Sequence, residues 1–241
     1  MEIKSNGIVL KSIDYNESDR LLTLFTAEKG KLTVGIRGVR KKGARLAFAS
    51  QPFCFAEYIL VQKGDKYTVK SAYLYDGFYP LRTDIVRYYA ASAALSVCQS
   101  LLGEEEKADG TFVALLQALK TLSYGEGDPA EPLTEFLLSA LLTAGYGISL
   151  DGCGYCEGEI GEKPYFDFSG GCFCCEDCAK GVRASLSTYH FLRKCGGLSY
   201  DEEKISGGAR RALKLIKTFL GTRLDFNATC LDEFLKLYGD E

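Results

Sequence analysis

The amino-acid sequence predicts an α+β protein of several domains, and three observations support this prediction. Residues 1–80 contain short runs rich in β-branched and aromatic residues, which are typical of strands. After Pro80 the apolar residues recur with the 3.6-residue period of helices. Two Cys-x-x-Cys pairs then interrupt the helical sequence. We therefore expect a β-barrel domain at residues 1–80, a helical domain at 81–150 and 183–241, and a zinc-binding segment inserted at 151–182.

The first eighty residues predict five strands: Ile3 to Leu10, Leu21 to Thr26, Leu32 to Arg37, Phe53 to Gln62 and Tyr67 to Tyr75. Turn residues follow the second strand at Lys29-Gly30 and the fourth at Lys63-Gly64-Asp65-Lys66. Five strands in about 75 residues match an OB-type barrel, which closes its edges and leaves one curved face for oligonucleotides. Other small five-stranded barrels have the same number of strands.

Six helices are expected after Pro80. Thr83 is the predicted N-cap of the first, and the acidic residues Glu104 to Glu106 are expected to form a solvated loop after its end. Pro132 opens the third helix and Gly145 ends it. The other predicted ranges are 111–122, 187–194, 206–219 and 231–238.

The cysteine spacing predicts one structural zinc ion per chain. Cys153 and Cys156 form the first pair, Cys175 and Cys178 the second, and eighteen residues separate the pairs. This spacing is typical of zinc sites, because two tight turns can aim four thiolates at one tetrahedral ion. A closed tetrahedron leaves no open position for a substrate, so the metal is expected to stabilise the fold.

Two alternatives to this ligand set remain open. Cys172 also makes a Cys-x-x-Cys pair with Cys175, and otherwise Cys172 and Cys174 are expected to be buried small residues. Disulfides of a secreted protein are the other alternative, but the chain opens without a basic and then apolar signal segment. The remaining cysteines are expected in the core: Cys54, Cys98, Cys195 and Cys230.

Charge is distributed unevenly along the chain. Residues 1–80 hold 13 Lys/Arg and eight Asp/Glu, whereas residues 81–241 hold 16 Lys/Arg and 24 Asp/Glu. This asymmetry suggests that the first domain meets a polyanion. From Lys29 to Arg45 there are seven basic residues and no acid.

The centre of this basic run is a candidate phosphate-binding loop. Gly38 and Gly43 let the backbone approach a ligand closely, and arginine forks match phosphate oxygens in pairs. A solvated basic loop without a ligand is the alternative. The candidate DNA-contact residues are Arg37, Arg40, Lys41, Lys42 and Arg45.

The aromatic residues near this loop have two interpretations. They could stack on bases, but strand alternation favours a place in the core for Phe53, Phe55 and Tyr58, and Phe48 lies beside them. A second aromatic group is expected to seal the barrel against the helices: Tyr73, Tyr75, Phe78 and Tyr79.

Motifs of catalysis and of membrane insertion are absent from the sequence. There is no phosphate-binding G-x-x-x-x-G-K-[ST] loop, and no Glu stands two residues after Cys153 as zinc deaminases require. His190 is the one histidine and is expected to be structural. No apolar run approaches the roughly 20 residues that cross a bilayer. These observations predict a protein that is not an enzyme.

Four stretches carry a resemblance to a known family: residues 14–26 with Gly30-Lys31, residues 37–42 through 51–53, residues 135–138 through 144–146, and the four-cysteine segment with Gly170-Gly171. In these the chain resembles the RecO family of DNA repair and recombination mediators. The resemblance implies sequence-independent binding of single- and double-stranded DNA, annealing of complementary strands, and loading of the recombinase RecA together with RecR onto DNA coated by single-strand-binding protein. It also implies a bacterial, cytoplasmic, nucleoid-associated protein.

Residue by residue, the resemblance assigns DNA contact to the five basic loop residues and adds Arg20, and it assigns the metal to the four paired cysteines. The main alternative function is a non-enzymatic protein–protein adaptor with a structural zinc site, in which the acidic helical part is the working surface. A zinc-dependent nuclease is a third class, and an all-thiolate ligand set argues against it.

Overall fold

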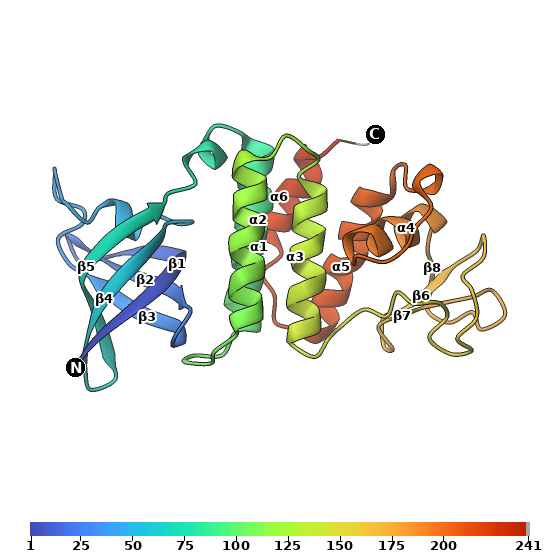
Figure 1. The fold of residues 1–241 in the computed structure, drawn as a ribbon, viewed down its shortest axis with the longest axis horizontal. Helices are drawn as coiled ribbons and strands as arrows, with labels where there is room; N and C mark the ends of the chain where they lie inside the picture. Colours follow the sequence, from blue (N-terminus) through green and yellow to red (C-terminus); the bar gives the residue numbers. More distant parts are fainter. Residues whose placement is uncertain (240–241) are drawn as a thin grey trace.

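The computed structural model describes residues 1–239, which form three parts along the long axis of the molecule. Figure 1 shows a barrel at one end, helices in the centre and a small sheet at the other end. This arrangement confirms the predicted order of barrel, helices and inserted cysteine segment. None of the helices in residues 1–239 is long and apolar enough to cross a membrane.

The barrel consists of five strands: β1 Glu2–Tyr15, β2 Asp19–Thr26, β3 Gly30–Ile36, β4 Phe55–Lys63 and β5 Lys66–Asp76. They close in the order β1-β2-β3-β5-β4, with β4 returning to β1. The pairs are antiparallel except for β3 with β5, which pair in parallel at Val34 and Tyr67. Closure leaves no long unpaired edge.

Strand alternation explains the interior of the barrel. In β3, Leu32, Val34 and Ile36 point inward while the intervening residues point outward. The first strand is longer than expected, because β1 and β2 form a hairpin that continues to Tyr15 and Asp19. Asn16 turns this hairpin in the left-handed backbone region, which asparagine tolerates.

All six predicted helices form, with ends shifted by a few residues: α1 Ile85–Leu101, α2 Asp109–Tyr124, α3 Ala130–Thr143, α4 Leu186–Cys195, α5 Gly208–Arg223 and α6 Thr229–Leu237. Three short 3₁₀ helices accompany them: η1 Phe48–Ser50, η2 Tyr79–Arg82 and η3 Glu202–Lys204. In Figure 1 the helices stand between the barrel and the small sheet, so they form the centre of the molecule.

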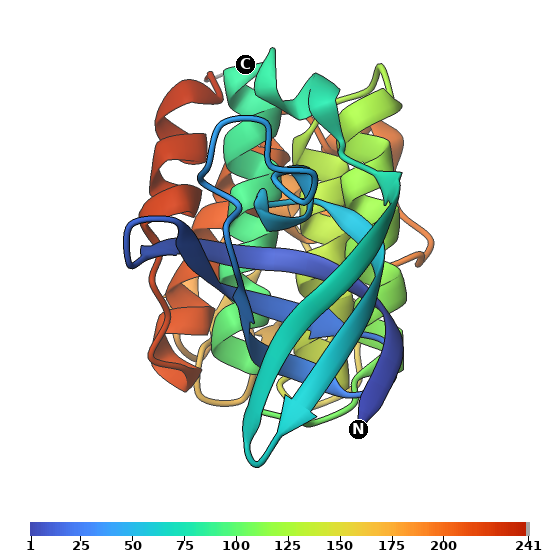
Figure 2. The same ribbon diagram turned by 90° about the vertical axis from the view of Figure 1, so that its left-hand side faces the viewer.

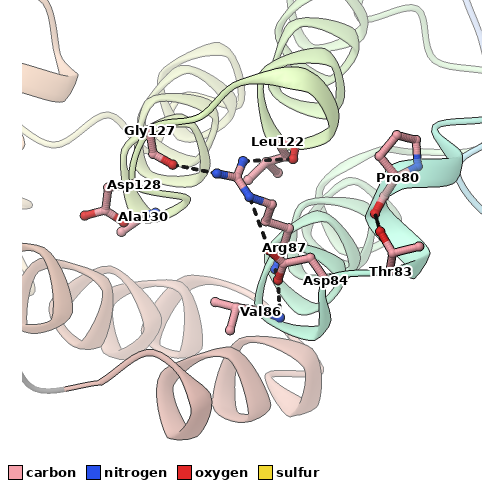
Figure 3. A network of polar contacts seen from close by, with 9 residues as sticks. All are labelled: Pro80, Thr83, Asp84, Val86, Arg87, Leu122, Gly127, Asp128 and Ala130. Atoms are coloured by element: carbon pink, nitrogen blue, oxygen red, sulfur yellow. Dashed lines mark hydrogen bonds and ion pairs between the residues drawn. The ribbon is translucent and has the colours of Figure 1, made fainter.

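The predicted cap of the first helix is wrong by one residue. The Asp84 carboxylate accepts bonds from the backbone N–H groups of Val86 and Arg87 at 3.0 and 3.1 Å (Figure 3). Thr83 instead donates its hydroxyl to the Pro80 carbonyl. The Arg87 guanidinium pairs with Asp84 and donates to carbonyls of Leu122 and Gly127, so it ties the start of α1 to the end of α2 (Figure 3).

The acidic residues after α1 are exposed, as expected, but the loop also contacts the barrel. The Glu105 N–H donates to the Lys31 carbonyl at 2.9 Å, and the Tyr67 hydroxyl donates to the Glu105 carboxylate at 3.0 Å. Gly30 has a φ of 69°, and a Cβ there would overlap the backbone of Glu106. This loop therefore docks the barrel onto the helical domain.

The second aromatic group only partly seals the barrel. Phe78 is fully buried, but Tyr73, Tyr75 and Tyr79 are 69%, 47% and 56% exposed. Tyr73 and Tyr75 occupy outward positions of β5, and Tyr75 donates to Glu57 across the pair of strands. The contacts between barrel and helices come from Phe25 and others in the shared core.

The inserted segment forms a small sheet of β6 Tyr165–Asp167, β7 Cys172–Cys174 and β8 Val182–Arg183, in the order β7-β6-β8. Phe166 contacts Phe219 of α5 edge-to-face, and Phe173 contacts Tyr189 of α4 at 4.9 Å between ring centroids. These contacts fix the segment against the helices.

Candidate nucleic-acid interface and metal centre

The basic loop lies between β3 and η1 at one end of the barrel. In Figure 2 it rises above the strands, away from the β4–β5 hairpin at the opposite end. Val39 is 5% exposed and packs into the barrel core, which anchors the loop. Gly43 has a φ of 75° with open space around its Cβ position. The five candidate residues are all exposed: Arg37, Arg40, Lys41, Lys42 and Arg45.

The base of this loop is held by the β1–β2 hairpin. The Asp19 carboxylate accepts the Gly38 N–H at 2.8 Å, and the Arg40 N–H donates to the Ser18 carbonyl. The bond from Gly38 holds the pKa of Asp19 below its usual range, and the nearby Arg37 and Lys41 charges act in the same direction. The loop is thus fixed at its base and open beyond it.

Two of the predicted DNA-contact residues share one carboxylate. Arg20 Nε lies 3.0 Å from Asp14 Oδ1, and Arg40 Nη2 lies 3.2 Å from Asp14 Oδ2. Arg20 also donates to Ser50, and Arg40 to the Asn16 carbonyl. The other four loop residues have no carboxylate within ion-pair distance among residues 1–239: Arg37, Lys41, Lys42 and Arg45.

The core interpretation of the nearby aromatic residues is confirmed for Phe53 and Tyr58, which are 1% and 0% exposed. Phe48 is half-buried against the barrel core, and Phe55 is half-buried against Phe112. The accessible rings of the barrel strands are instead Tyr73 and Tyr75 on β5 and Tyr15 at the end of β1. Alternation in the run from Ala72 to Tyr75 is the sequence signal that would have placed Tyr73 and Tyr75 outside.

The structure brings the four paired cysteines together. Their sulfurs lie within 4.8 Å of one another, and those of Cys156 and Cys175 are 3.7 Å apart. Four ligands at about 2.3 Å around a tetrahedral zinc ion would have sulfurs about 3.8 Å apart. Cys172 lies outside this group, so the second pair is Cys175 with Cys178. The four residues fit a metal ion.

The first cysteine turn is shaped to stabilise a thiolate. Cys153 is buried, which opposes ionisation, but backbone N–H groups of Cys175, Tyr155 and Cys156 point at its sulfur and lower the pKa of Cys153 to about 6. Its own N–H donates to the Gly158 carbonyl, which closes the turn. At Gly154 a Cβ would lie 2.6 Å from the Cys172 sulfur, so glycine is required there.

The remaining cysteines behave largely as expected. Cys172 and Cys174 are buried on β7, and burial raises the pKa of the Cys174 thiol to about 11. Core positions are confirmed for Cys54, Cys98 and Cys195, and Cys230 is half-buried. Burial also raises the pKa of the Cys54 thiol to about 11, which keeps it neutral.

His190 accepts a hydrogen bond from the Asp201 N–H at 3.1 Å, and burial lowers the pKa of its ring. This backbone bond is consistent with the structural role expected for it. On α5, Lys217 pairs with Asp232 and Arg211 donates to Ser187, whereas Lys214 is exposed. Part of the charge of this helix is therefore engaged within the fold.

Comparison with known proteins places this architecture in one family. The family described as Recombination protein O N terminal matches residues 1–78, and Recombination protein O C terminal matches residues 82–229. A protein named DNA repair protein RecO from Myxococcus xanthus is 38% identical over 209 residues, which cover 86% of this chain and 83% of that protein. A protein of the same name from Acetivibrio thermocellus is 28% identical over 214 residues, which cover 89% of this chain and 78% of that protein. The chain belongs to the RecO family of DNA repair and recombination proteins.

Proposed function

We propose that this chain is a recombination mediator that binds single- and double-stranded DNA without sequence preference and anneals complementary strands. The observation that supports this most directly is the exposed basic loop at the end of the barrel. Among residues 1–239, no carboxylate lies within ion-pair distance of Arg37, Lys41, Lys42 or Arg45. Membership of the RecO family supports the same role.

The charge arrangement favours the phosphate backbone as the ligand. Cations that neutralise phosphates release condensed counterions, and this gain is independent of base sequence. If four cations each meet one phosphate of a single strand, the affinity falls about 50-fold between 50 and 200 mM salt. Phe53 and Tyr58 are buried, so these two rings do not stack on bases.

Annealing needs no covalent chemistry, and we propose that the chain is not an enzyme. Two polyanions approach each other once their repulsion is neutralised, so a cationic surface suffices. The glycine at position 43 lets the exposed part of the loop follow either strand.

The partners implied by the family are also part of the proposal. With RecR, the chain would help RecA onto DNA coated by single-strand-binding protein, in the bacterial cytoplasm at the nucleoid. The acidic helical part is the candidate surface for protein partners, because like charge repels DNA from it.

For the cysteine centre we propose one zinc ion per chain, held by Cys153, Cys156, Cys175 and Cys178. Four thiolates in a tetrahedron suit zinc and leave no open coordination position. When bound, the ion would supply folding free energy to the inserted segment.

The experiment that tests DNA binding compares two double variants by fluorescence anisotropy with labelled single strands. Lys42→Glu with Arg45→Glu is expected to weaken binding at least tenfold for every sequence and to slow annealing. Lys63→Glu with Lys66→Glu makes the same change in charge on the β4–β5 hairpin, at the other end of the barrel (Figure 2), and is expected to have little effect. Equal affinities of the two variants would refute the assignment to the loop. Absent or salt-insensitive DNA binding beside a stable protein complex would favour the adaptor function.

A further inference from the structure

The carboxylate of Asp167 is buried next to the cysteine centre and has several donors around it. Asp167 ends β6 and is 5% exposed. It accepts the Tyr155 hydroxyl at 2.6 Å and the backbone N–H groups of Ser169 and Gly170 at 3.0 and 3.1 Å. Lys180 Nζ lies 3.5 Å from the same carboxylate oxygen that Tyr155 contacts. A buried charge with this set of donors is well compensated.

Two of these donors lie in or directly after the cysteine turns. Tyr155 stands between Cys153 and Cys156 in the first turn, and Lys180 follows Cys178 by two residues. Lys180 Nζ also donates to the Tyr155 hydroxyl at 2.8 Å and lies 4.8 Å from the centre of its ring. A side chain of the first turn and a side chain just after the second turn therefore meet at one carboxylate.

The position of Asp167 is fixed independently of the four paired cysteines. Its backbone pairs with Cys172 in the small sheet, and its carbonyl accepts the Gly171 N–H at 2.8 Å. A Cβ at Gly170 would lie 2.9 Å from Asp167 Oδ2, so the turn after β6 closes tightly over the carboxylate. Neighbouring Phe166 packs against α5. Asp167 is thus a fixed point of the folded segment.

We propose that Tyr155, Asp167 and Lys180 form a clamp that positions both cysteine turns for the metal ion. Holding the turns in place before the ion binds reduces the ordering that binding requires. Metal binding is therefore tighter and metal release slower. These three are positioning residues, since none of them supplies a ligand atom. This inference rests on the zinc site of the proposed function.

The test measures zinc affinity of the full-length chain by competition with a chromophoric chelator. Tyr155→Phe keeps the ring but removes the hydroxyl that joins Asp167 and Lys180, and it is expected to weaken zinc binding about 10- to 100-fold. Tyr146→Phe removes a hydroxyl with no hydrogen bond partner among residues 1–239 and serves as the matched control, with affinity unchanged. Lys180→Met is also expected to weaken zinc binding.

Amide hydrogen exchange of the metal-free chain separates positioning from general stability. The wild-type turn at residues 153–156 is expected to be protected, and Tyr155→Phe is expected to lose that protection while the helices keep theirs. If the wild type binds one zinc ion and Tyr155→Phe binds zinc with equal affinity, the clamp is overturned but the metal site is not. A wild type that binds no zinc would overturn both the clamp and the proposed metal.

Discussion

Arg40 lies 3.2 Å from the carboxylate of Asp14, and this pair joins the basic loop to the β1–β2 hairpin. Arg20 contacts the other oxygen of the same carboxylate. One acid thus partly neutralises two cations at the edge of the proposed DNA-binding surface. The pair is partly exposed, so it contributes little to stability but lowers the local positive potential.

Asp14→Asn is therefore expected to increase the affinity for single-stranded DNA several-fold at low salt, because Arg20 and Arg40 become available to phosphate. Anisotropy titration at 50 mM salt measures this change. Asp65→Asn, in the distant β4–β5 hairpin, is the control for net charge alone. Weaker binding by Asp14→Asn would show that the pair instead holds the loop in its active shape.

Acid is expected to release the base of the loop. The folded-state pKa of Asp19 is lowered by the Gly38 N–H, so the bond is fully present above the unfolded-state pKa of about 3.9 and is lost as the pH falls through the lowered folded value. The Gly38 amide resonance in NMR should follow this titration, with a midpoint below 3.9. In Asp19→Asn the same resonance should not titrate in this range. A midpoint above 3.9 would contradict the assigned bond.

Gly30→Ala should destabilise the chain far more than Gly43→Ala. Both glycines have positive φ, 69° and 75°, which strains an alanine by about 1–2 kcal/mol. Only at position 30 would the new methyl group also overlap a backbone, that of Glu106. Urea unfolding should therefore show an additional loss of about 2 kcal/mol or more for Gly30→Ala. Equal losses would mean that the barrel is not docked on this loop.

The cysteine centre predicts different outcomes for two serine variants. Cys156→Ser removes a ligand and is expected to lose most of the zinc, with lower thermal stability of the inserted segment. Cys174→Ser changes a buried thiol outside the group of four and should keep about one zinc per chain. Metal analysis of both purified chains measures this. Retention of zinc by Cys156→Ser, or its loss in Cys174→Ser, would contradict the ligand set.

The sequence predicted the architecture well where periodicity is strong. Alternation in β3 and the 3.6-residue period of the helices follow directly from burial on one face, so element type was recoverable. The sequence could not distinguish Asp84 from Thr83 as the N-cap of α1, because both residue types cap helices and the two positions are adjacent.

Long-range contacts account for the other differences. Glu105 lies in a run of acidic residues, so the sequence predicts only exposure to solvent. Its contacts with Lys31 and Tyr67 arise only in the folded barrel. The shared carboxylate of Asp14 and the meeting of Tyr155 with Lys180 also join residues far apart in sequence. The cysteine centre was predictable because its spacing is local within each turn.

The salt dependence of single-strand binding tests the central proposal most directly. With four loop cations on phosphates, the slope of log K against log salt concentration should be about −2.8 for the wild type, and about −1.4 for Lys42→Gln with Arg45→Gln. Equal slopes for wild type and variant would contradict the proposal that the basic loop after β3 binds the DNA.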